Sequence, residues 1–108
     1  MLRGEVWCVE FDPAVGSEIR KTRPAIIVSN NTANKYLARV QVVPLSSNVE
    51  RIYPSETVVT IAGAKSKAMA DQIMTADKRR LKESIGRLTQ ADMRAVETII
   101  QIQLGLSS

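Results

Sequence analysis

The alternation of hydrophobic and polar residues predicts a chain built mainly from short β-strands. Residues 4–11 are rich in β-branched and aromatic side chains, which favour strands. Residues 24–29 begin with an almost wholly apolar run, the pattern of a strand that is buried on both faces. Further strands are predicted at 39–44, 55–61, 66–74 and 84–88.

One long helix is predicted at the end of the chain, from about Gln90 to Leu104. Thr89 followed three residues later by Asp92 has the spacing of a capping box. The apolar positions form a broad stripe, so we expect the helix to pack on the strands and to leave some apolar surface uncovered. The positions expected to be partly buried are Met93, Val96, Ile100 and Leu104. Two shorter turns are also expected, a helical one after Asn30 and one capped by Asp77.

Many short strands followed by a single long helix indicate one mainly β domain of the α+β class, spanning residues 1–108. The closest architecture is a small, twisted SH3-like β-barrel with a packed C-terminal α-helix. No repeat, low-complexity segment or linker suggests a second domain.

Composition excludes several classes of function. Apolar residues make up 44% of the chain, but no run approaches the ~20 residues that span a bilayer, and the N-terminus lacks the apolar core of a signal peptide. We therefore expect a cytoplasmic protein without membrane contact. There is no histidine, and the single cysteine, Cys8, is expected to be a buried structural thiol. Histidine-based triads and Cys- or His-based metal sites are thus excluded, and neither a metal nor a cofactor is expected.

Positive charge is concentrated in residues 65–87. This segment has seven basic and three acidic side chains and accounts for the whole net charge of +4. Clustered positive charge indicates a polyanionic partner, either a nucleic acid or an acidic protein, although a solvated basic turn explains charge alone equally well.

Polar residues recur where the predicted strands begin or end. A charged loop carries Ser17 and Glu18 toward Arg23, at the start of the apolar strand, and two other strand ends carry Ser46-Ser47-Asn48 and Asp71-Gln72. An arginine beside a hydroxyl suits a phosphodiester, because the planar guanidinium reaches two phosphoryl oxygens and the hydroxyl adds a third donor. A nearby carboxylate could accept the proton of an RNA 2′-hydroxyl that attacks its own phosphate.

Each of these residues also has a structural explanation. Glu18 and Arg23 could form an ion pair within the loop, which contributes ~0–1 kcal/mol to stability. The segment from Ser46 to Asn48 has the composition of a turn, and Asp71 could bond to backbone. Residue chemistry by itself therefore leaves catalysis and local structure both open.

Seven segments in order along nearly the whole chain resemble the MazF/PemK (Kid) family of toxin endoribonucleases from bacterial toxin–antitoxin pairs. They are RGEVW at 3–7, DP at 12–13, GSE at 16–18, RPAIIVS at 23–29, VPLSS at 43–47, ADQI at 70–73 and IGRL at 85–88. Each segment is short, and it is their combination and spacing that make the resemblance specific.

The resemblance implies an SH3-like barrel of the CcdB/MazF/Kid type, a symmetric homodimer and inhibition by a cognate acidic antitoxin. It also implies metal-independent cleavage of single-stranded RNA, such as mRNA, at short sequences, with 2′,3′-cyclic phosphate and 5′-hydroxyl ends. By this resemblance Arg23 stabilises the phosphate and donates or relays a proton. Ser46 supplies a hydroxyl where many relatives have threonine, and Glu18 corresponds to the acid of the GSE motif, which is the general base in some members.

One branch of the family, that of PemK, has a histidine in place of the serine of GSE and an arginine before the DQ motif. This chain has Ser17 and Met69 at those positions, so that catalytic set is not intact. Asp71 is therefore a secondary candidate for the base. The candidate substrate contacts are Ser17, Ser47, Asn48, Asp71 and Gln72.

Two other functions compete with the ribonuclease. A gyrase-poisoning toxin of the CcdB type shares the fold but acts through a helix end that bears tryptophan, whereas this chain ends in LGLSS and has its only tryptophan at position 7. A non-catalytic SH3-like adaptor would need an aromatic groove for proline-rich ligands. One Trp, two Tyr and one Phe make such a groove hard to build.

Overall fold

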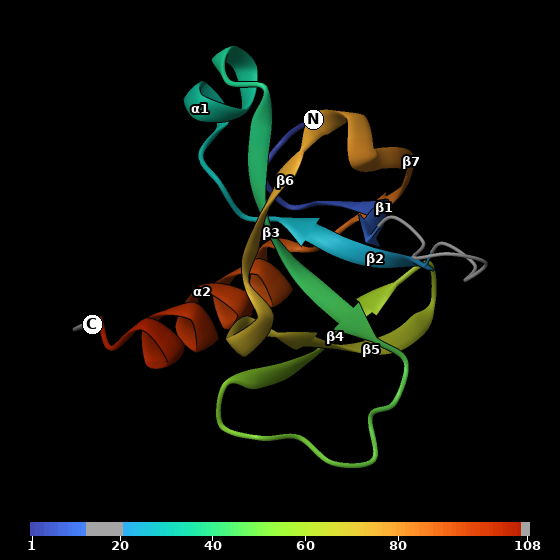
Figure 1. Ribbon diagram of the computed structural model, residues 1–108. Coiled ribbons are helices and arrows are strands. Elements are labelled where there is room, and N and C mark those ends of the chain that lie inside the picture. Colours follow the sequence, from blue (N-terminus) through green and yellow to red (C-terminus); the bar gives the residue numbers. More distant parts are fainter. Residues whose placement is uncertain (13–20, 107–108) are drawn as a thin grey trace.

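The computed structural model describes residues 1–12 and 21–106. The chain folds into an antiparallel sheet and a C-terminal helix (Figure 1). The strands are β1 (Glu5–Asp12), β2 (Lys21–Ile27), β3 (Arg39–Ser46), β4 (Glu56–Ile61), β5 (Ala64–Met69), β6 (Met74–Asp77) and β7 (Leu81–Arg87). The helices are α1 (Asn31–Tyr36), η1 (Ala70–Gln72), η2 (Lys78–Arg80) and α2 (Gln90–Leu104), where η marks a 3-10 turn. The predicted mainly β fold with a terminal helix is confirmed.

Strand β3 connects the two halves of the sheet. The strand order is β4-β5-β3-β2-β1-β7, and β6 also pairs with β3. Along one edge β3 pairs with β2. Along its other edge it pairs first with β6, where Val40 lies opposite Ala76, and then with β5, where Leu45 lies opposite Ala68. The partner of β3 on this edge changes between Val42 and Leu45, and the last residue of the strand, Ser46, pairs with Lys67 of β5.

The core has two parts, one on each face of the central strands. Ile26 and Val43 belong to the cluster that α2 covers with Val96 and Ile99. Ile27, the next residue of β2, belongs to the second cluster, because successive side chains of a strand point to opposite faces. The second cluster consists of Val9, Ala25, Ile27, Val40, Val42, Ala76 and Leu81. The prediction that the apolar strand is buried on both faces is confirmed.

The strand predicted at 66–74 is wrong in one respect, because the structure divides it into β5, η1 and β6. The backbone N–H of Ala70 bonds to Ser55 O at 3.0 Å, and that of Ile73 bonds to Ala70 O at 3.1 Å. The second bond closes a 3-10 turn and the first ties that turn to Ser55, and the chain passes from the end of β3, beside β5, toward its beginning, beside β6. The following turn is capped as predicted, since Asp77 Oδ1 accepts from Arg79 N at 2.8 Å. Strand β7 then begins at Leu81 and not at Ser84.

Helix α2 has the predicted limits, but only part of the predicted capping box. Thr89 Oγ1 accepts from Asp92 N at 3.1 Å. The Asp92 carboxylate is directed elsewhere: its Oδ2 accepts from Thr60 N at 3.0 Å and ties the helix to β4. Val96 is buried and Met93 and Ile100 pack against the core, whereas Leu104 is 53% exposed, contrary to the prediction. The last turn of α2 extends past the edge of the sheet (Figure 1).

The side chain of Cys8 also differs from the prediction, because the thiol is free and only partly buried. Its neighbours Val6 and Val9 fill the two core clusters, and Cys8 belongs to neither of them. No helix in the described ranges has the length and apolar content needed to cross a membrane.

Candidate functional site

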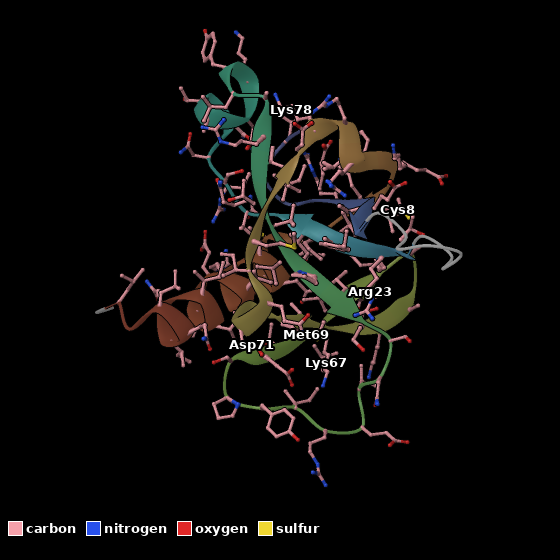
Figure 2. The ribbon with its side chains drawn as sticks, viewed as in Figure 1. Cys8, Arg23, Lys67, Met69, Asp71 and Lys78 are labelled. Atoms are coloured by element: carbon pink, nitrogen blue, oxygen red, sulfur yellow. The ribbon has the colours of Figure 1, made fainter. Side chains whose placement is uncertain are left out.

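The site is built where β2 begins and β3 ends. The β2–β3 pairing sets Ile27 opposite Val42 and Ala25 opposite Pro44. Continued by two residues, this register sets Arg23 opposite Ser46, and neighbouring strands are about 4.8 Å apart. Figure 2 shows Arg23 beside the end of β3. The structure therefore brings together two of the three predicted catalytic residues.

The same register gives the face of the sheet on which these side chains lie. Residues directly opposite each other in an antiparallel pair share a face. Side chains two or four residues apart in a strand share a face, so Arg23 lies on the face of Ala25 and Ser46 on the face of Val42. Ala25 and Val42 both belong to the second core cluster. The side chains of Arg23 and Ser46 therefore lie on the face away from α2. On its other edge Ser46 is paired with Lys67 of β5.

The Ser46 hydroxyl accepts a hydrogen bond within the turn and keeps its own hydrogen available to donate. Its Oγ accepts from Asn48 N at 3.2 Å, and Asn48 Oδ1 in turn accepts from Glu50 N at 3.2 Å. The turn chemistry expected for this segment is therefore present. Both bonds use oxygen acceptors, so the Ser46 hydroxyl proton and the Asn48 amide hydrogens can still bond to a substrate.

Arg23 is exposed, and no described residue forms an ion pair with its guanidinium. Five donors in a planar fork are thus available for an anion at the Ser46 end of β3. The other two predicted residues of this loop, Ser17 and Glu18, lie outside the described residues.

Asp71 and Gln72 lie away from this pair. Both are exposed on η1, and Gln72 Nε2 donates to Met69 Sδ at 3.5 Å. Asp71 follows Lys67, the strand partner of Ser46, by four residues and lies in η1, beyond the end of β5. Figure 2 shows Asp71 near α2, apart from Arg23. The geometry therefore groups Arg23 with Ser46 and leaves Asp71 and Gln72 at the periphery.

The sequence interpretation missed an anchor beside the site. Lys67 Nζ donates to Glu56 Oε1 at 3.1 Å and to Arg51 O at 3.0 Å, and lies 5.7 Å from the centroid of the Tyr53 ring. Glu56 and Lys67 are diagonal neighbours in the β4–β5 hairpin, since Val58 is the direct partner of Lys67. Opposite charges at diagonal positions of a predicted hairpin were the signal that could have identified them.

The basic segment 65–87 does not form one patch. Lys67 lies at one end of the molecule and Lys78 at the other (Figure 2). Lys78 Nζ donates to Asn34 O, and Arg80 Nη1 donates to Phe11 O at 3.1 Å, so both cations hold local structure. Arg79 bonds to Asp77, and these bonds lower the pKa of that carboxyl. The positive charge of residues 65–87 is therefore divided between the two ends of the molecule.

Acidic residues do not gather into a metal site in the part of the chain that the structure describes. No group of three or more His, Cys, Asp or Glu residues there could hold an ion. The chemistry available at the described site is that of a guanidinium and a hydroxyl on one sheet face, which suits binding and stabilising a phosphoryl group.

Comparison with known proteins identifies the family. The PemK-like, MazF-like toxin of type II toxin–antitoxin systems matches residues 2–104. The chain is 38% identical to Endoribonuclease MazF9 of Mycobacterium tuberculosis, over all of this chain and 99% of the relative. It is 36% identical to Endoribonuclease MazF of Staphylococcus saprophyticus, over 98% of this chain and 92% of the relative.

Solved structures give the same result. An endoribonuclease from a mycobacterial species, solved in complex with its cognate antitoxin, superposes with a TM-score of 0.82 at 29% identity. The match covers 100% of this chain and 98% of that one.

Proposed function

This chain belongs to the PemK-like, MazF-like toxin family of type II toxin–antitoxin systems, and from that membership we propose that it is an endoribonuclease toxin. Its substrate is single-stranded RNA in the cytoplasm, mRNA in particular, cut at a short recurrent sequence. The relatives that support this proposal are themselves named endoribonucleases and match almost end to end. They also favour it over a gyrase-poisoning toxin and over an adaptor.

The observation that carries the proposal is the position of Arg23 beside the end of β3, where the β2–β3 register, continued by two residues beyond Ala25–Pro44, brings it to Ser46. No described residue forms an ion pair with its guanidinium. A scissile phosphate between them would receive donors from both side chains. The negative charge on its non-bridging oxygens grows in the transition state, and preformed donors stabilise that charge more than they stabilise the ground state.

In the proposed reaction the ribose 2′-oxygen attacks the adjacent phosphorus and the bond from phosphorus to the 5′-oxygen breaks. A base removes the 2′-hydroxyl proton, and Glu18 is the first candidate for it, with Asp71 second. An acid gives a proton to the departing 5′-oxygen, and we assign this step to Arg23 as donor or relay. The products are a 2′,3′-cyclic phosphate and a 5′-hydroxyl, and neither a metal nor a cofactor takes part.

The neighbouring polar residues would bind the RNA on either side of the cut. Ser47 and Asn48 continue from Ser46 and are exposed, so they can reach the nucleotide next to the phosphate. Ser17 would act from the loop before β2. Asp71 and Gln72, which lie farther away, would contact a more distant nucleotide.

Two protein partners complete the proposal. The solved complex of a mycobacterial relative with its cognate antitoxin supports an antitoxin partner. We expect this antitoxin to be acidic and to block the site. A second copy of the chain would cover the apolar end of α2, where Ile102 and Leu104 are each 53% exposed and Leu106 is 57% exposed. Uncovered apolar side chains at this density favour a twofold contact.

The proposal is tested with the purified protein and a long, unstructured RNA. We expect fragments that share one short sequence at their ends, and no cutting once the cognate antitoxin is added. Inhibition of DNA gyrase without RNA cleavage would instead assign the protein to the gyrase-poisoning class.

A further inference from the structure

A hollow of about 500 Å³ lies between the segment that follows β3 and strand β5. It is lined by Asn48, Glu50, Arg51, Tyr53 and Lys67, and we refer to it as the Tyr53 hollow. Its floor, Lys67, is the strand partner of Ser46, and its first wall residue, Asn48, bonds through its backbone N–H to the Ser46 hydroxyl at 3.2 Å. The hollow is therefore contiguous with the phosphate site.

A well-buried ion pair holds the hollow open. The side chains of Lys67 and Glu56 are only 12% and 8% exposed, and their Nζ and Oε1 atoms are 3.1 Å apart. Glu56 Oε1 also accepts from Tyr53 N at 2.9 Å, while Lys67 Nζ donates to Arg51 O at 3.0 Å. One ion pair thus fixes the backbone of the loop at both Arg51 and Tyr53.

Tyr53 is the aromatic wall of the hollow. Its side chain is 53% exposed although its backbone is held by two bonds to Glu56, one through its N–H and one through its carbonyl. A rigid backbone with an open aromatic ring provides a preformed stacking surface, and Lys67 adds positive charge 5.7 Å from the ring centroid. Asn48 amide hydrogens and the Glu50 carboxylate supply donors and acceptors at the rim.

We propose that the Tyr53 hollow binds one unpaired nucleobase of the RNA, stacked on Tyr53, immediately next to the scissile phosphate. The proposal rests on the proposed ribonuclease function and names a base-binding site for it. Aromatic stacking with nearby cations is the common way in which proteins hold single-stranded bases. Glu56 does not line the hollow and acts as a positioning residue, whereas Lys67 both keeps the loop in its binding shape and forms the floor of the hollow.

The first test is a scan of RNA substrates in which one nucleotide at a time lacks its base. With the wild-type protein we expect one such position next to the cut to raise KM about 5- to 150-fold, the range that loss of one stacked base produces. Tyr53→Leu should show the same loss with intact RNA and no further loss with that one abasic RNA. Tyr53→Phe, which keeps the ring, should behave as wild type.

Tyr36→Leu is the matched control. Tyr36 is also exposed, at 73%, and also has a lysine near its ring, with Lys35 Nζ 5.3 Å from the centroid. It belongs to α1, at the other end of the molecule, and it is not a lining residue of the hollow (Figure 1). An equal rise in KM for Tyr53→Leu and Tyr36→Leu would overturn the proposal. So would a Tyr53→Leu rise in KM that adds to the effect of every abasic position.

The second test removes the ion pair without leaving a buried charge, by the double substitution Glu56→Gln with Lys67→Met. We expect KM to rise as in Tyr53→Leu while kcat stays near the wild-type value, and the sensitive abasic position to lose its effect. An unchanged KM, or a kcat loss that is the same for intact and abasic RNA, would contradict the positioning role.

The experiments distinguish an error in the base-binding proposal from an error in the ribonuclease proposal. A strand with 2′-deoxyribose at every nucleotide lacks the attacking hydroxyl and requires no known cut site, so its binding can be followed by fluorescence anisotropy whether or not the protein cuts RNA. Absence of cleavage with a Tyr53-dependent affinity would reject the ribonuclease and keep the base site. Cleavage with an affinity that does not depend on Tyr53 would do the reverse.

Discussion

Lys67 lies directly opposite Ser46 in the β3–β5 pair, so the residue that anchors loop 47–55 is one strand away from the hydroxyl of the candidate site. In the proposed reaction, RNA binding and chemistry would thus be connected through a paired part of the sheet and not through the loop alone. A change at either Lys67 or Glu56 is expected to alter how RNA is held, whereas a change at Arg23 is expected to alter the reaction itself.

Substitution of Arg23 tests the assigned chemistry. Arg23→Ala and Arg23→Lys should both lower kcat by roughly 10²–10³-fold, because a lysine supplies charge but not the planar pair of donors. Since Arg23 is exposed, either variant should keep wild-type stability to within about 0.5 kcal/mol.

Arg39→Ala is the control for this experiment, because Arg39 is an exposed arginine at the opposite end of β3. It should cut RNA at the wild-type rate. Cleavage by Arg23→Ala that matched that of the control would remove Arg23 from the mechanism.

The exposed end of α2 predicts the oligomeric state. Light scattering should give a mass near twice the 11.9 kDa of one chain. Leu104→Lys should shift the protein toward the monomer, because it places a charge on a surface that the second copy would bury. Leu37→Lys, at a leucine of α1's C-terminal cap that is 45% exposed, should leave the dimer intact. A wild-type protein that is monomeric at micromolar concentration would contradict the dimer.

Glu5 predicts how the stability of the fold depends on pH. Burial of Glu5 would raise its pKa, but hydrogen bonds from Leu2 N and Trp7 Nε1, with the charges of the N-terminus and Arg87, outweigh burial and lower it below its ordinary value of 4.5. A lowered pKa in the folded state stabilises the protein above the unfolded pKa, and that stabilisation is lost as the pH falls through the folded value.

We therefore expect Glu5→Gln to be less stable than wild type at pH 7, by up to about 1 kcal/mol. The difference should shrink as the pH falls below 4.5. Urea unfolding of both proteins at pH 7 and at pH 3 measures it. A difference of the same size at both pH values would show that the Glu5 charge has no part in stability.

Much of the fold could be predicted because the pattern of apolar and capping residues in the sequence agrees with the tertiary structure. The apolar run at 25–27 is fully buried, and α2 starts after Thr89 as its capping residue indicates. The break in the strand predicted at 66–74 could not be predicted, since the turn that Ile73 N closes on Ala70 O is held by a bond from Ala70 N to Ser55 O, fifteen residues before Ala70. Only the pairing of β5 and β6 with the same strand makes that turn necessary.

The candidate site was predictable in part. Arg23 and Ser46 follow from strand ends and from the family resemblance, and the register sets them opposite each other. The Tyr53 hollow was not foreseen, because its walls depend on a side-chain pair, Glu56 with Lys67, whose partners are eleven residues apart and bond to the backbone of a third segment. Periodicity identifies the faces of strands but not which backbone atoms a charged side chain will reach.

Cleavage of a matched pair of RNAs in excess EDTA separates metal-independent attack by the 2′-hydroxyl from metal-dependent hydrolysis. One RNA carries ribose throughout and the other carries a single 2′-deoxyribose at the nucleotide before the cut. We predict that the all-ribose RNA is cut to a 2′,3′-cyclic phosphate and a 5′-hydroxyl, and that the deoxy substrate stays intact at that position. Cutting of the deoxy substrate, or cleavage that stops in EDTA and returns with Mg²⁺, would contradict it.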